Sequence, residues 1–224
     1  MTILPNAEVT AILHASGRPC LGDGGGVDRA KDGSRPPVLP TAPGRDVIVA
    51  RVGRVSGHVV LPPDQYVASL ARKRMAASAL FRDEAGRVLL VEPTYKPVWD
   101  LPGGAVEAEE SPHAACRREV REELGLDRAP GRVLAVDWVP SRPRDGVMIP
   151  DGVIIVYDGG ILTEAEAKEI VVADGELAGF AFVSGDEIAG RVTQLVARRI
   201  ASCLDALAAG TVAALENGSP AEGT

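Results

Sequence analysis

Three glutamates stand close together in the stretch ESPHAACRREVREELGL. Glu119, Glu122 and Glu123 have the i, i+3 and i+4 spacing that puts side chains on one face of a helix. Like charges at this spacing repel, so the arrangement favours a bound cation or a basic neighbour. Carboxylate oxygens suit Mg²⁺ or Mn²⁺, which retain water and substrate phosphate as ligands. A solvated acidic helix face is the alternative explanation.

The same stretch carries signals for both ends of a helix. Ser111 is a suitable N-cap, Pro112 suits the first helical position, and Gly125 suits a left-handed C-terminal cap. An apolar stripe recurs every four residues and is expected to face the core; it consists of Cys116, Val120 and Leu124. Cys116 is therefore predicted to be a packing residue and not a nucleophile.

This helix and the turn before it resemble the Nudix box. That motif is a Gly, five residues, a Glu, seven residues, Arg-Glu, an aliphatic, any residue, Glu-Glu, any residue, Gly and an aliphatic. The matching residues are Gly104, Glu110, Arg118, Glu119, Val120, Glu122, Glu123, Gly125 and Leu126. The resemblance also covers the Pro-Gly-Gly turn and the strands before it, and spans roughly residues 75–209. It implies an α+β fold, in which a mixed sheet is sandwiched between helices.

The resemblance also implies roles for individual residues. The metal ligands would be the carboxylates of Glu119, Glu122 and Glu123 and the carbonyl of Gly103. Arg118 would orient Glu119, which is also a candidate general base, although family members differ in which glutamate takes that role. Gly104, Glu110 and Gly125 would be structural residues of the motif. Cations are needed on physical grounds as well, because an acidic site repels an anionic diphosphate unless metal ions reverse the local charge.

Residues outside the motif are expected to choose the substrate. The candidates are Tyr95 and Lys96, just before the motif, and Arg142 and Arg144 in the long loop SRPRDGVMIPDG, because such loops often carry binding groups. Solvated loop charges are the alternative for the arginines.

Four further residues carry weaker expectations. Glu107 and Glu176 could add acidic groups near the metals, but a surface position is the stronger expectation for each. Trp99 is expected to pack beside the loop of the motif, and Trp138 to lie in the core.

Apolar patterning predicts the elements that hold the motif. Strands are expected at 75–81 and 87–92, joined as a hairpin, and at 132–138, 152–157 and 179–183, with a helix at 192–209. The predicted organisation is an N-terminal extension over residues 1–65, partly flexible because it is rich in Gly and Pro, a domain over 66–209, and a flexible tail over 210–224.

Composition narrows the class of protein. The 224 residues carry a net charge of −7, which argues against a partner that is a nucleic-acid polymer. The three cysteines are widely spaced and odd in number, which argues against a disulfide framework and favours the cytoplasm. No apolar run approaches the roughly 18 residues of a membrane span.

The sequence therefore predicts a Mg²⁺- or Mn²⁺-dependent hydrolase that cleaves a nucleoside diphosphate-X or a related organic diphosphate. The substrate is expected to be a small molecule, and a specialised-metabolite diphosphate remains open. The alternative function is a nucleotide-sensing regulatory module of Nudix type without turnover. The resemblance leaves open a homodimer, because many family members pair.

Overall fold

The computed structural model describes residues 61–144, 146–172 and 175–222, and the chain divides into two compact units, Met1–Ala71 and Arg72–Thr224. In the first unit, the described residues form the short helix α2 (Pro63–Ser69). The second unit holds all the remaining described elements. It begins at Arg72, a few residues beyond the predicted start at 66. The predicted flexible segment within residues 1–60 lies outside the described residues.

One mixed sheet of eight strands forms the centre of the second unit, in the order β10-β9-β4-β7-β1-β2-β8, with β3 beside β1. The pairs β1–β7 and β4–β9 are parallel, and the other pairs are antiparallel. The strands are β1 (Arg74–Asp83), β2 (Val88–Pro93), β3 (Gly103–Ala105), β4 (Val133–Val139), β7 (Gly152–Leu162), β8 (Leu177–Val183), β9 (Ala213–Glu216) and β10 (Ser219–Pro220).

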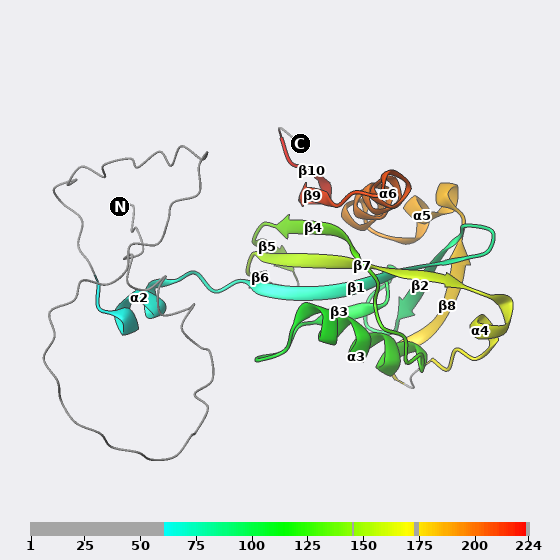
Figure 1. The fold of residues 1–224 in the computed structure, drawn as a ribbon, viewed down its shortest axis with the longest axis horizontal. Coiled ribbons are helices and arrows are strands. Elements are labelled where there is room, and N and C mark those ends of the chain that lie inside the picture. Colours follow the sequence, from blue (N-terminus) through cyan, green and yellow to red (C-terminus); the bar gives the residue numbers. More distant parts are fainter. Residues whose placement is uncertain (1–60, 145, 173–174, 223–224) are drawn as a thin grey trace, which may run out of the picture. The chain divides into compact units, whose positions relative to one another are not determined.

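Helices cover both faces of this sheet, as Figure 1 shows. Helix α3 (Pro112–Leu124) packs on one face, while α5 (Gly185–Arg191) and α6 (Gln194–Ala209) pack on the other. The short helix α4 (Glu164–Lys168) follows β7. Each face has its own apolar cluster, so the predicted α+β sandwich is confirmed.

The central strands are apolar on both sides because both sides are covered. In β2, Val88 and Leu90 join the cluster under α6, while Leu89 and Val91 join the cluster under α3. A strand buried on two faces has a continuous apolar run instead of alternation. The predicted hairpin of β1 and β2 is confirmed.

Two regions differ from the prediction. The expected long loop after β4 contains a separate antiparallel hairpin of β5 (Arg142–Arg144) and β6 (Val147–Ile149). The expected flexible tail from residue 210 instead contributes β9 and β10 to the main sheet, with Leu215 buried. Its polar composition concealed this pairing, because the strands are held largely through backbone hydrogen bonds. None of the described helices is long and apolar enough to span a membrane.

Candidate active site

Helix α3 begins and ends as its sequence predicts. The Ser111 hydroxyl accepts a hydrogen bond from Ala114 N at 3.2 Å. Gly125 has a φ of 70° and donates its N–H to Arg121 O at 3.0 Å. The apolar stripe is buried, and burial raises the pKa of the Cys116 thiol to about 12. Cys116 is therefore a neutral packing residue, as predicted.

Two of the three glutamates lie against the Pro-Gly-Gly bend. Glu123 Oε2 accepts a hydrogen bond from Gly103 N at 2.7 Å, which ties the helix to the bend. A Cβ at Gly104 would overlap the carboxylate of Glu119, so that side chain also reaches the bend. Gly103 has a φ of 141°, and a Cβ there would collide with the backbone of β1 at Ala77. Gly104 is thus required for the close approach of helix and bend, and Gly103 for the close approach of the bend and β1.

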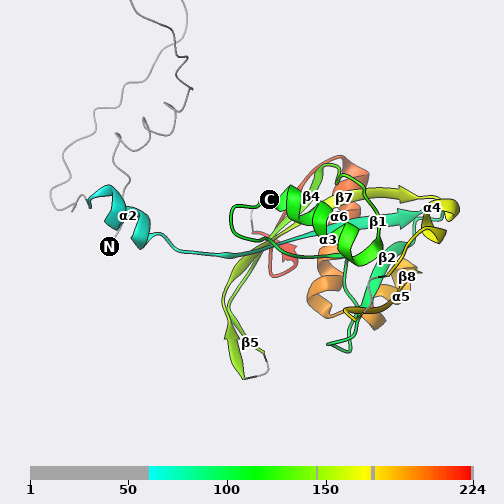
Figure 2. The ribbon, with the colours of Figure 1, turned by 90° about the horizontal axis from the view of Figure 1, so that it is seen from below.

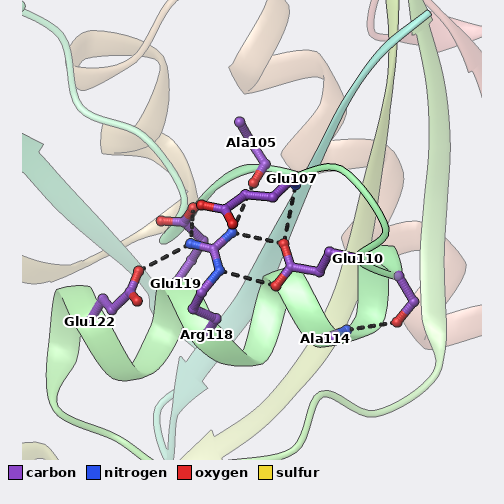
Figure 3. Close-up of polar contacts among 8 residues, drawn as sticks. Ala105, Glu107, Glu110, Ala114, Arg118, Glu119 and Glu122 are labelled. Atoms are coloured by element: carbon purple, nitrogen blue, oxygen red, sulfur yellow. Dashed lines mark hydrogen bonds and ion pairs between the residues drawn. The ribbon is translucent and has the colours of Figure 1, made fainter.

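Arg118 connects the acidic side chains, as Figure 3 shows. Its Nε and Nη2 donate to the two carboxylate oxygens of Glu110 at 3.0 and 2.9 Å. Its Nη1 donates to Glu119 Oε1 at 2.8 Å and to Glu122 Oε2 at 3.0 Å. Nη2 also donates to the carbonyl of Ala105 at 3.0 Å. A single guanidinium therefore joins the loop of the motif to its helix.

Glu110 lies where the motif places its first glutamate. Besides Arg118, its Oε2 accepts a hydrogen bond from Glu107 N at 3.2 Å. These hydrogen bonds, chiefly those from Arg118, hold the pKa of Glu110 below its ordinary value. Glu107 contributes its backbone here, while its side chain is exposed.

The glutamates at the bend differ from one another in burial. Glu123 is 9% exposed, and burial raises the pKa of its carboxyl to about 8 despite the hydrogen bond from Gly103 N. Burial also raises the pKa of Glu119, although Arg118 opposes that shift. The Glu122 side chain is 53% exposed. The site thus holds two carboxyl groups whose ionised forms lack enough positive charge nearby.

Two more carboxylates lie close to these glutamates. The charges of Asp100 and Glu176 contribute to the raised pKa of Glu123. Glu176 follows the end of β2 in space, since Thr94 N donates to its carbonyl at 2.9 Å. Glu176 was among the residues expected from the sequence, whereas Asp100 was not. The sequence signal for Asp100 is its position directly before the Leu-Pro-Gly-Gly segment.

The donor set fits a hard divalent cation in its chemistry. Carboxylate oxygens and a glycine carbonyl are ligands that Mg²⁺ and Mn²⁺ prefer, and nearby positive charge would favour the ionised form of Glu123. Over the described ranges, no three His, Cys, Asp or Glu side chains stand in a metal-binding geometry. Instead, Arg118 bonds to both Glu119 and Glu122.

The predicted substrate residues separate into two groups. Tyr95 and Lys96 line a cavity of about 580 Å³ at the end of β2. Arg142 and Arg144 lie in the β5–β6 hairpin, which projects away from α3 in Figure 2. The structure therefore does not bring these arginines to the glutamates.

The two tryptophans lie in different surroundings. Trp99 packs against the cluster on the α6 face and lies under Arg191, whose guanidinium carbon is 4.8 Å from the ring centroid. Trp138 was predicted to lie in the core, which is wrong, because it is 39% exposed. The alternation of side chains along a strand indicates on which face of the sheet Trp138 lies, but not whether other residues cover that face.

Comparisons with known proteins point in one direction. The NUDIX domain model matches residues 72–203. Diphosphoinositol polyphosphate phosphohydrolase 2 of Rattus norvegicus is 46% identical over 66 residues, which cover 29% of this chain and 37% of that protein. RNA pyrophosphohydrolase of Gluconacetobacter diazotrophicus is 36% identical over 81 residues, covering 32% of this chain and 48% of that protein.

The matched segments thus span less than half the length of these two relatives. Among solved structures, a UDP-X diphosphatase aligns with a TM-score of 0.50 and 18% identity, covering 70% of this chain and 76% of that one. At this identity the likeness concerns the fold alone.

Proposed function

This chain belongs to the Nudix family, and we propose that it is a metal-dependent hydrolase cleaving the diphosphate linkage of a nucleoside diphosphate-X or a related organic diphosphate. One observation carries the proposal: Glu119 and Glu123 meet the Pro-Gly-Gly bend while Arg118 joins loop and helix. A solvated acidic face, the alternative explanation of the glutamates, does not account for a buried Glu123.

In the proposed site, Glu119, Glu122, Glu123 and the Gly103 carbonyl would hold Mg²⁺ or Mn²⁺. The metal would polarise a phosphoryl oxygen and acidify a water molecule. Arg118 and Glu110 keep the loop and the helix in register, because their paired hydrogen bonds fix both groups in one plane. Glu119 is partly buried and has a raised pKa, so it suits the acceptance of a proton from water.

Arg118 has two sets of contacts in the proposed site. Its Nη1 donates to Glu119 and Glu122, two of the residues that would hold the metal. Its Nε and Nη2 bond to Glu110 and to the Ala105 carbonyl, which are not among those residues. Arg118 then remains a positioning group, since its contacts with the loop do not depend on the metal ligands.

The names of the relatives support the reaction class. One is named a phosphohydrolase of diphosphoinositol polyphosphates and the other a pyrophosphohydrolase of RNA. We propose a small-molecule diphosphate for this chain because its net charge of −7 disfavours a polymer of phosphates. A cytoplasmic location agrees with free thiols at Cys116 and Cys203. The homodimer stays a prediction.

A substrate panel tests the proposal directly. Nucleoside triphosphates, dinucleotide cofactors, nucleotide sugars and prenyl diphosphates are incubated with Mg²⁺ or with a chelator, and released phosphate is measured after phosphatase treatment. At least one compound should turn over with Mg²⁺ and none with the chelator. Glu122→Gln should lower that rate by about 10³-fold, as expected when a group stabilising the transition state is lost.

A matched control is Glu164→Gln on α4, where the exposed carboxylate pairs with Lys168. This variant should keep the wild-type rate. Full activity of Glu122→Gln would contradict the metal site. Binding of a nucleotide without any product under Mg²⁺ or Mn²⁺ would favour the sensing module instead.

A further inference from the structure

The cavity at the end of β2 is wide open to solvent and has the volume of a small-molecule site. Its volume is about 580 Å³, within the usual range of roughly 300–1,000 Å³ for ligand pockets. The lining residues are Glu92, Pro93, Thr94, Tyr95, Lys96, Pro97 and Ala178. Proline, tyrosine and alanine give it flat apolar surfaces, which suit a planar ring.

Tyr95 provides an aromatic surface at this cavity. Its side chain is 69% exposed although it is large and apolar. The ammonium of Lys96 lies 5.8 Å from the centroid of its ring. An exposed ring is a platform on which a base can stack. The Lys96 ammonium bonds to Asp100, and its remaining donors can contact a phosphate.

Glu92 is a partly buried carboxylate with no protein partner. It lies at the end of β2, where the pairing with β8 shifts register. Among the residues that the structure describes, none forms a hydrogen bond or ion pair with its side chain. The oxygens of Glu92 are open to solvent, and an ionised carboxylate only accepts hydrogen bonds. A ligand bearing adjacent donors would therefore satisfy both oxygens in place of water.

The residues that line the cavity directly precede the bend of the proposed active site in the chain. Lys96 Nζ lies 2.7 Å from Asp100 Oδ2, and Asp100 stands three residues before Gly103. A ligand with its base at Tyr95 can therefore direct its phosphates past Lys96 towards the bend. The charged residues of the lining are Glu92 and Lys96, so a polyphosphorylated polyol would find one cation here.

We propose that Glu92 makes this cavity selective for guanine over other bases, an inference that rests on the proposed hydrolysis of a nucleoside diphosphate-X. Guanine presents N1–H and the N2 amino group side by side, which matches the two oxygens of a carboxylate. The pairing edge of adenine or cytosine places a ring acceptor beside its amino donor, and uracil flanks its N–H with carbonyls. Each of these leaves a carboxylate oxygen facing an acceptor.

Calorimetry with nucleoside monophosphates and Mg²⁺ tests this selectivity without requiring turnover. Wild-type protein should bind GMP about 10- to 100-fold more tightly than AMP or UMP, as expected for a hydrogen-bonded pair with a charged group. IMP, which lacks the N2 amino group, should fall between GMP and AMP. Glu92→Gln should reduce the preference for GMP to about threefold or less.

The matched control is Glu84→Gln in the exposed turn between β1 and β2, which should retain the wild-type preference. Tyr95→Ala should weaken the affinity for all four nucleotides alike, because stacking does not depend on the hydrogen-bonding groups of the base. Equal affinity for GMP and AMP in wild type would overturn the proposal. A second result would also overturn it. If wild type bound all the bases equally but bound 2′-deoxy-GMP more weakly than GMP, and Glu92→Gln removed that difference, Glu92 would recognise ribose and not the base.

The outcomes also separate this proposal from the proposed hydrolysis. GMP preference without turnover of any diphosphate would support the role of Glu92 and contradict the enzyme. Turnover of diphosphates with no dependence on the base would support the enzyme and contradict the role of Glu92.

Discussion

The helices on the two faces of the sheet each carry a charged cluster, and the clusters are built differently. On the α6 face, Asp137 accepts hydrogen bonds from Arg199 Nε at 2.8 Å and from Gly218 N at 3.0 Å. Both charged side chains are buried, and the negative charge of Asp137 balances the positive charge of Arg199. On the α3 face, Arg118 is shared among Glu110, Glu119 and Glu122.

This difference indicates that the Asp137 cluster has a structural role and that the Arg118 cluster has a role in the chemistry of the site. The Asp137 pair has its hydrogen-bonding groups satisfied within the fold, and it fastens β4, α6 and the segment after β9 together. The α3 cluster has more carboxylates than cations, and the Glu123 carboxylate accepts its hydrogen bond from Gly103 N and not from Arg118. A surplus of buried negative charge costs stability, and it is explained if a cation belongs there.

Breaking the buried pair should give the largest change in stability. Asp137→Asn leaves the Arg199 charge buried without its counter-ion, so the free energy of unfolding should fall by about 3–5 kcal/mol. Urea denaturation measures this change. Asp127→Asn, which removes an exposed pair with Arg117, is the control and should cost less than about 1 kcal/mol. Equal effects of the two variants would contradict the structural role of Asp137.

Disturbing the shared guanidinium should affect catalysis more than stability. Arg118→Lys keeps the charge but loses the planar fork that bonds Glu110 through two nitrogens. We expect kcat/KM for the diphosphate substrate to fall about 10- to 100-fold, because small misplacements of positioned groups are costly. Arg117→Lys on the same helix should leave the rate unchanged. A wild-type rate in Arg118→Lys would show that the glutamates need no such positioning.

The features of these clusters that could be predicted from sequence are those determined by neighbouring residues in the chain. Ser111, Pro112 and Gly125 mark the helix ends within the helix itself, and the spacing of the glutamates follows from the same helix. The charge of Asp100 acts on Glu123 because a loop brings the two near each other, and the position of Asp100 before Leu-Pro-Gly-Gly is only an indirect signal of this.

Non-local pairing explains the other omissions. The segment from 213 to 220 looked like a tail because its partners, β4 and the buried Asp137, lie far away in sequence. Its strands pair through backbone atoms, which leave no residue pattern, and its buried side chain Leu215 joins the cluster on the α6 face. Arg142 and Arg144 were grouped with the substrate residues by loop length alone, whereas the hairpin carries them away from α3.

A smaller effect concerns pH in the metal-free protein. Burial raises the pKa of Glu123 from 4.5 to about 8, so the folded state favours its neutral form. The stability from this group is complete below 4.5 and is lost as pH rises through about 8. With a chelator present, the thermal midpoint of wild type should therefore fall over this window more than that of Glu123→Gln. Parallel pH profiles would contradict the burial of this carboxyl.

Titration of Mn²⁺ tests most directly whether the excess carboxylates of α3 hold a cation. Calorimetry should show that wild type binds Mn²⁺ and that Glu119→Gln and Glu123→Gln each weaken its affinity at least about tenfold, while Glu164→Gln does not. Equal Mn²⁺ affinity in wild type and in both site variants would contradict the account, because the ion would then be bound elsewhere.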